Sequence, residues 1–244
     1  MTDLDNDIER LQNMTDTSSR IVFFGGAGVS TESGVADFRG VTGLYNQKYK
    51  YPPETILSHT FFEAHPEEFF RFYRDKMLCL SAEPNAAHRK LAELEAAGKL
   101  SAVVTQNIDG LHQKAGSKRV FELHGSVLRN HCTRCGKSYS AEFIQNTTGV
   151  PTCVCGGIIK PDVVLYEEML NRETLNSAVE AIANADMLIV GGTSLTVYPA
   201  AGLVNYYSGD RLVLINRTST PLDENANLVI TASIGETLAK IRVR

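Results

Sequence analysis

The chain of 244 residues has no excess of basic residues, since 24 lysines and arginines stand against 28 acids and give a net charge of −4. Without a basic run, nothing in the charge pattern favours tight binding to nucleic acid or to an anionic membrane surface. No apolar run approaches the roughly 20 residues that a membrane-spanning helix needs. The acidic start of the chain also lacks the basic and apolar segments of a signal peptide. We therefore expect a cytoplasmic, monomeric protein with no direct nucleic-acid partner and no membrane contact.

Cysteines are few, and four of the five lie in two close pairs. Cys132-x-x-Cys135 and Cys153-x-Cys155 are separated by 17 residues. Four thiolates complete a tetrahedral shell with no open position, which predicts a structural zinc. Buried free thiols or a redox pair are the alternatives. Cys79 is left over among apolar residues and is expected to be an inert core thiol.

Short apolar runs alternate with amphipathic stretches along most of the chain. This alternation predicts an α/β fold with a Rossmann-like, doubly wound parallel sheet, a smaller zinc-binding module and a helical insertion. The expected division is a discontinuous Rossmann-like domain over 1–36, 81–125 and 165–244, a helical and loop insertion over 37–80, and the zinc-binding module over 126–164. Helices are expected over 4–18, 66–77, 86–97, 172–184, from about 199, and over 234–243.

A glycine-rich turn follows the first predicted strand, Ile21 to Phe24. Gly25, Gly26 and Gly28 lead into an expected helix start, an arrangement that cradles phosphate because backbone N–H groups can point at the anion. The third glycine of the dinucleotide fingerprint is replaced by Thr31. An ordinary glycine turn remains the alternative. The Asp37-Phe38-Arg39 sequence that follows places an acid, an aromatic ring and a permanent cation side by side.

Polar residues also follow three later strands, and the ends of parallel strands converge at one crevice. Asn107 and Asp109 are two apart, so in an extended segment they face the same side and suit a ribose or a carboxamide. Turn capping is the alternative for this pair. Thr193 and Ser194 can present hydroxyl groups to phosphate, and Asn216 can reach a ribose.

His124 stands at the end of a predicted strand, beyond this polar cluster. A histidine that titrates near neutral pH is the usual general base, although a structural role is the alternative. His112 is expected to be a structural hydrogen-bonding residue in the first turn of a helix. No distinguishing context marks the remaining histidines, which are His59, His65, His88 and His131.

Taken together, these motifs resemble the sirtuin family of NAD-dependent protein deacylases. The resemblance covers about Ile21 to Gly235. It rests on the order and spacing of Gly26–Arg39, Thr105–His112, His124-Gly125, the four paired cysteines, Pro161–Val164 and Gly192–Ala200.

The resemblance implies contacts to NAD from the Rossmann-like domain and from the start of the 37–80 insertion. The pyrophosphate and a ribose would be held by Ala27, Thr31, Arg39 and Gln106. The nicotinamide pocket would comprise Phe38, Ile108 and Asp109. Asn107 would orient the nicotinamide ribose as a catalytic residue beside His124. The adenosine half would be held by Thr193, Ser194, Asn216 and the backbone around Ile234.

The implied function is an NAD-dependent protein-lysine deacetylase with NAD as co-substrate, structural zinc, and acetylated-lysine proteins or peptides as substrates. The acyl oxygen would attack the ribose carbon as nicotinamide leaves, and His124 would then activate a ribose hydroxyl that takes over the acyl group. Water would complete the release, and the products would be free lysine, nicotinamide and O-acetyl-ADP-ribose. The alternatives are a protein ADP-ribosyltransferase that uses the same NAD site, or a non-enzymatic NAD-sensing zinc module.

The substrate peptide would lie as an extra strand between Val163–Tyr166 and Ser194–Val197. Two departures from the family pattern stand out: Ala36 replaces a usual proline, and Tyr166–Glu168 replaces a Phe-Gly-Glu type segment. The Tyr-x-x-Arg pair of desuccinylating members is not reproduced. We therefore expect a preference for uncharged acyl groups, because burying an unpaired carboxylate is costly.

Overall fold

The structure is a computed structural model that describes residues 3–38, 43 and 49–244. Within this part of the chain, the larger sheet has six strands in the order β3-β2-β1-β7-β8-β9, and neighbouring strands are parallel. The strands are β1 (Ile21–Gly25), β2 (Leu100–Thr105), β3 (Val120–Glu122), β7 (Met187–Gly191), β8 (Leu212–Asn216) and β9 (Leu228–Thr231). The order reverses between β1 and β7, so the carboxyl ends of these two strands open the crevice where such sheets bind ligands. The predicted doubly wound α/β fold is confirmed.

The alternation of side chains along β1 explains why helices cover both faces of this sheet. Ile21 and Phe23 point to one face, and Val22 and Phe24 point to the other. The first face packs against α1 (Asp3–Asp16), α5 (Ala86–Ala96) and α9 (Ile234–Ala239). The second packs against α8 (Arg172–Ala183) and the 3-10 helix η5 (Ala200–Tyr206). All five strand residues are buried, as expected for a parallel sheet covered on both sides.

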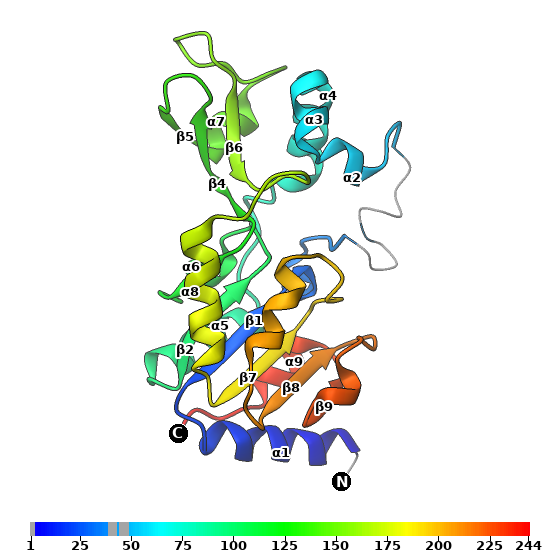
Figure 1. Cartoon of the computed structure of the whole chain (residues 1–244), viewed down its shortest axis with the longest axis vertical. Coiled ribbons are helices and arrows are strands. Elements are labelled where there is room, and N and C mark those ends of the chain that lie inside the picture. The colour runs from blue at the N-terminus through cyan, green and yellow to red at the C-terminus, as the bar shows by residue number, and fades with distance from the viewer. Residues whose placement is uncertain (1–2, 39–42, 44–48) are drawn as a thin grey trace.

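A second lobe stands above the sheet in Figure 1 and has its own apolar core. It contains an antiparallel sheet of order β5-β4-β6 and a helical group. The elements are β4 (Gly125–Cys132), β5 (Ser138–Ser140), β6 (Ile159–Val163), α7 (Ala141–Asn146), α2 (Pro53–Ile56), α3 (His59–Ala64), α4 (Pro66–Phe72) and the π-helix η4 (Tyr73–Met77). T-shaped contacts among Phe62, Phe69 and Phe70 dominate the helical part.

The chain passes from the large sheet to the upper lobe through a very short connection. β3 ends at Glu122 and β4 begins at Gly125, so Leu123 and His124 alone join the two sheets. The chain returns just after β6, where the N–H of Val164 donates to the carbonyl oxygen of His124 at 3.0 Å. His124 therefore lies at the junction of the two lobes.

Several predicted elements differ in detail. The glycine turn does not open an α-helix: it continues as two single 3-10 turns, η1 (Ala27–Val29) and η2 (Thr31–Ser33). The second turn ends at Gly34, whose φ of 79° leaves the helical region. The predicted helix over 66–77 changes to a π-helix after Phe72, and the expected C-terminal helix ends at Ala239. No helix in the described chain is long and apolar enough to span a membrane.

Candidate active site at the junction of the two lobes

Glycines in the loops after β1 and β7 allow these loops to touch. A Cβ atom on Gly28 would lie 2.8 Å from the Cα atom of Gly192, and one on Gly192 would lie 2.4 Å from the main-chain nitrogen of Val29. The N–H of Gly28 donates to the carbonyl oxygen of Gly192 at 2.8 Å. The glycine pattern that predicted a phosphate cradle thus also serves close contact between the two strand ends that form the crevice.

Ser30 joins the two polar residues predicted to share a side. The side-chain amide of Asn107 donates to Ser30 Oγ at 3.0 Å, and Ser30 Oγ donates to Asp109 Oδ2 at 2.6 Å. The second Asp109 oxygen accepts the N–H of Leu111 at 2.9 Å. Asn107 and Asp109 therefore do converge, and Asp109 also caps the turn as the alternative interpretation expected.

His88 extends this network and was missed by the sequence interpretation. The N–H of Asn85 donates to Nδ1 of His88 at 3.3 Å, so the ring proton lies on Nε2, which is 3.5 Å from Ser30 Oγ. Burial lowers the pKa of His88 to about 4, although the charge of Asp109 opposes this. A signal was available, because Asn85 is the N-cap of α5 and His88 occupies the third helical position of a capping box.

His112 is not the hydrogen-bonding residue that was predicted. Within the described chain neither ring nitrogen has a partner, although the side chain is buried. Its ring packs edge-on against His88 at 4.7 Å between centroids and lies 6.1 Å from the Phe23 ring. Burial lowers the pKa of His112 to about 3, so the ring is neutral and packs as an aromatic residue.

His124 is held by its ring as well as by its main chain. Nδ1 lies 3.0 Å from the carbonyl oxygen of Gln106, the residue that follows β2. A carbonyl oxygen only accepts, so Nδ1 carries the proton and Nε2 keeps its lone pair. Burial lowers the pKa of His124, and the bond to Gln106 acts in the opposite sense. The neutral ring at pH 7 therefore presents Nε2 as a proton acceptor.

A second polar group lies across the crevice, at the ends of β7 and β8. The side-chain amide of Gln106 donates to Thr193 Oγ1 at 3.0 Å, and the N–H of Thr193 donates to Asn216 Oδ1 at 3.0 Å. That bond fixes the amide orientation of Asn216. Its Nδ2 atom is buried without a partner among the described residues, so it is available to a ligand.

The remaining predicted NAD contacts are spread along the same crevice. Ala27 and Thr31 begin the two 3-10 turns, and the Thr31 hydroxyl donates to the carbonyl oxygen of Gly28 at 2.9 Å. Phe38 and Ile108 are half-buried and pack against the core of the upper lobe. Arg39 lies outside the described residues.

Two predicted adenosine contacts differ in exposure. Ser194 is exposed, and its hydroxyl lies 2.8 Å from that of Thr196. Ile234 is buried in the core at the start of α9, which leaves only its backbone for a ligand. The next N–H, that of Gly235, donates to Glu32 Oε1 at 3.1 Å. Glu32 therefore ties the glycine loop to α9.

The four paired cysteines meet in the upper lobe. Their Sγ atoms all lie within 4.8 Å of one another, with Cys132 3.4 Å from Cys155 and Cys135 3.6 Å from Cys153. Sulfurs at about 2.3 Å from a tetrahedral zinc would be about 3.8 Å apart, so the group fits zinc. The N–H groups of Arg134 and Cys135 point at Cys132 Sγ, as expected around a thiolate ligand.

The Tyr166–Glu168 segment, which departs from the expected Phe-Gly-Glu pattern, is tied to α3. The N–H of Tyr166 donates to Leu57, and its carbonyl oxygen accepts the N–H of His59 at 3.0 Å. Glu167 has a φ of 77°, where a glycine would be unstrained, and its carboxylate accepts both the N–H and the hydroxyl of Thr60. Glu168 accepts bonds from His59, Lys160 and the N–H of Leu165.

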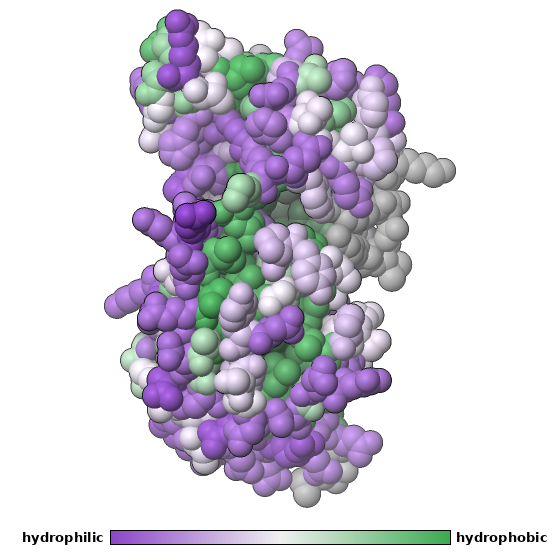
Figure 2. Space-filling view, in the orientation of Figure 1, coloured by the Kyte–Doolittle hydropathy of each residue, from purple (hydrophilic) through white to green (hydrophobic). Residues whose placement is uncertain are grey.

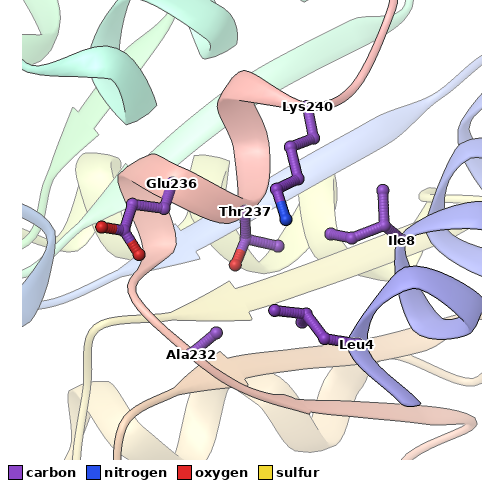
Figure 3. A pocket seen from close by; sticks show the side chains of 6 residues that line it. All are labelled: Leu4, Ile8, Ala232, Glu236, Thr237 and Lys240. Carbon is purple, nitrogen blue, oxygen red and sulfur yellow. The ribbon is translucent and has the colours of Figure 1, made fainter. Parts of the chain in front are cut away.

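One face of the molecule carries a band of apolar residues. Figure 2 shows apolar residues running along the middle of one face, from where the upper and lower parts meet down over the larger sheet. A separate hollow of about 280 Å³ lies between α1 and α9. Leu4, Ile8 and Ala232 give it apolar walls, as Figure 3 shows. It gathers none of the predicted site residues.

Comparisons with known proteins agree with this geometry. The family model described as Sir2 family matches residues 26–199. A protein of Clostridium perfringens named NAD-dependent protein deacetylase is 58% identical over 242 residues, which cover 98% of this chain and 99% of that protein.

Solved structures give the same result. A Sir2 complex with a deacetylated p53 peptide and 3′-O-acetyl ADP ribose has a TM-score of 0.89 at 40% identity, covering 96% of both chains. A Sir2 complex with a p53 peptide and NAD+ has a TM-score of 0.85 at 40% identity, covering 95% of both chains. The chain belongs to the Sir2, or sirtuin, family.

Proposed function

We propose that the chain is an NAD-dependent protein-lysine deacetylase that transfers the acetyl group from lysine to ADP-ribose and releases nicotinamide. The observation that carries this proposal is the orientation of His124, which presents Nε2 as a base at the junction of the lobes. The names of the similar bacterial proteins, and Sir2 complexes with peptide and NAD+, support the same reaction.

The polar groups along the crevice suit the two ends of NAD. The free Nδ2 atom of Asn216 can donate to the adenosine ribose. Asn107, Ser30 and Asp109 form a connected group that suits the nicotinamide ribose and the carboxamide. When bound, NAD supplies the ADP-ribose acceptor and a leaving group that is already cationic.

The residues at the nicotinamide end have separate roles in the proposed reaction. Asn107 orients the ribose, Asp109 binds the carboxamide, and Phe38 and Ile108 form an apolar wall that excludes water. His124 Nε2 accepts the proton of a ribose hydroxyl, which makes that oxygen nucleophilic toward the acyl carbon. Positioning supplies much of the remaining rate, because an amide oxygen is a weak nucleophile.

The other contacts complete the proposed NAD site. Ala27, Thr31 and Gln106 hold the pyrophosphate and a ribose together with Arg39. Thr193, Ser194 and the backbone at Ile234 hold the adenosine half. The substrate is an acetylated-lysine peptide that docks between Val163–Tyr166 and Ser194–Val197. The N–H of Leu165 is taken by the Glu168 side chain, so docking there exchanges that bond for one to the peptide.

The test is an assay with the zinc-replete chain, NAD and an acetyl-lysine peptide. We expect loss of acetyl from the peptide, release of nicotinamide, and O-acetyl-ADP-ribose by mass spectrometry. His124→Ala should abolish nearly all turnover. ADP-ribose found on the peptide would instead identify a transferase, and full turnover by His124→Ala would remove the proposed base.

The compartment, oligomeric state and domain boundaries of the enzyme are also proposals. We propose a cytoplasmic monomer that binds no nucleic acid, with domains at 1–36, 81–125 and 165–244, an insertion at 37–80 and the zinc-binding module at 126–164. Light scattering of the purified chain checks the monomer, and limited proteolysis checks the boundaries.

A further inference from the structure

Arg129, on β4, forms ion pairs with carboxylates on two other strands, next to the two-residue connection that contains His124. Its Nη1 atom lies 2.8 Å from Glu122 Oε2, and its Nε atom lies 2.7 Å from Asp162 Oδ2. Glu122 ends β3, the edge strand of the large sheet, whereas Asp162 belongs to β6 of the upper lobe. One guanidinium therefore links β3, the strand that ends two residues before His124, to β6, which pairs with β4 directly after His124.

An irregularity in β4 places Arg129 in this position. Ser126 pairs with Asp162, but the next residues paired with β6 are Asn130 and Pro161, so 127–129 form a bulge with no opposing residues on β6. The bulge bends toward the NAD-binding side, because the N–H of Val127 donates to the carbonyl oxygen of Ile108 at 2.9 Å.

The two carboxylates depend on this cation. The Glu122 side chain is 9% exposed, so its charge is largely removed from water, whereas the Asp162 side chain is 44% exposed and its backbone lies against Gly125. A Cβ atom on Gly125 would lie 2.0 Å from the carbonyl oxygen of Asp162, so the two strands are in direct contact there. Without Arg129, the largely buried Glu122 charge would lose its cation, and the ion-pair link between β3 and β6 would be lost.

We propose that Arg129 is a positioning residue for His124: by joining Glu122 and Asp162, it fixes the angle at which Nε2 meets the ribose hydroxyl. This inference rests on the proposed function. The Arg129 side chain is itself 50% exposed, and its bonds run to the two strands.

The proposal separates two reactions of the same enzyme. Exchange of labelled nicotinamide into NAD needs the acyl oxygen and the nicotinamide pocket, but it precedes the step that uses His124. Acyl transfer to the ribose hydroxyl needs the base in place. Misplacing His124 should therefore slow deacetylation and spare exchange.

The test measures both reactions in Arg129→Met, Arg129→Lys and Arg119→Met. We expect Arg129→Met to lower kcat for deacetylation about 10-fold, while exchange and the KM for NAD change less than about twofold. The kcat of Arg129→Lys should be intermediate, since an ammonium group can pair with one carboxylate but does not reach both as the planar guanidinium does. Arg119, which directly precedes β3 and whose guanidinium lies over the Phe121 ring at 5.5 Å, is the control for loss of an arginine nearby and should leave both reactions unchanged.

Two further readouts distinguish positioning from a general loss of structure. The acidic limb of the deacetylation profile should move up in pH in Arg129→Met, because a loosened His124 becomes more hydrated. Adding Glu122→Gln to Arg129→Met should restore part of kcat by removing the buried charge that has lost its partner.

Equal losses in exchange and deacetylation, or no loss in either, would overturn the proposal. If Arg129→Met loses zinc or fails to fold, Arg129→Lys decides: it must slow deacetylation and spare exchange. A wild-type chain inactive in both assays would instead overturn the proposed function.

Discussion

Nδ1 of His124 lies 3.0 Å from the main-chain oxygen of Gln106, and this bond determines which ring nitrogen can act as a base. The bond depends on two neighbouring strands of the large sheet, because Gln106 follows β2 and His124 follows β3. Pairing of these strands therefore orients the imidazole before any ligand binds. Such preorganisation spares the reaction the cost of arranging the base.

The first prediction concerns pH. Burial lowers the pKa of His124 below its usual 6.5, so the base stays unprotonated at pH 7 and is lost only as pH falls through the lowered value. We expect the acidic limb of kcat/KM against pH, which reports the free enzyme, to have an apparent pKa below 6.5. His124→Ala should lower kcat at least about 100-fold, whereas His65→Ala, at an exposed position, should not. An acidic limb with an apparent pKa at or above 6.5 would contradict the assignment of His124 as the base.

The second prediction concerns zinc. The purified chain should contain one zinc per molecule, and Cys153→Ser should lower that content and the thermal midpoint, because metal binding and folding of the module are coupled. Cys79→Ser is the matched control, since Cys79 lies outside the cluster and should leave the zinc content at one. Metal analysis and thermal unfolding provide the measurements. Full zinc content in Cys153→Ser would exclude that thiolate as a ligand.

Much of the site could be predicted because parallel strands bring their ends together. A short apolar strand followed by polar residues was enough to place Asn107, Asp109, Thr193 and Asn216 along one crevice. The cysteine spacing was equally informative, since pairs this close are a recurring signal for zinc.

The features of the site that the sequence did not predict depend on contacts between residues far apart in the chain. His88 and Ser30 are 58 residues apart in sequence, and no local pattern says that α5 brings them together. His112 was misjudged because its burial comes from the packing of α6 (Leu111–Lys114) against α5. The β4 bulge at Arg129 was also invisible, because it exists only relative to the register of β6.

The third prediction concerns the strained residue in the Tyr166–Glu168 segment. Glu167→Gly would relieve a positive φ but lose two bonds to Thr60, so the effects oppose each other. Glu167→Ala would lose the same bonds and keep the strain. We expect the urea midpoint to fall more for Glu167→Ala than for Glu167→Gly. Equal midpoints would mean that the positive φ carries no cost here.

The fourth prediction concerns the buried ring of His112. Its pKa of about 3 in the folded chain lies well below the usual 6.5, so the unfolded chain binds a proton more readily. Stability from this group is complete above pH 6.5 and falls as pH drops from 6.5 toward 3, by about 1.4 kcal/mol for each pH unit. Phenylalanine has a similar ring and no proton to bind, and His112 makes no hydrogen bond to another described residue that it would lose.

Urea unfolding of wild type and His112→Phe at pH 7 and pH 5 tests this linkage. Between these conditions the wild-type chain should lose about 2 kcal/mol more than the variant, because the variant lacks one proton-linked group. His65→Phe is the control for a histidine-to-phenylalanine change at an exposed position. The same loss in His112→Phe as in wild type would mean that His112 can become protonated in the folded chain, which would require water or a partner at its ring.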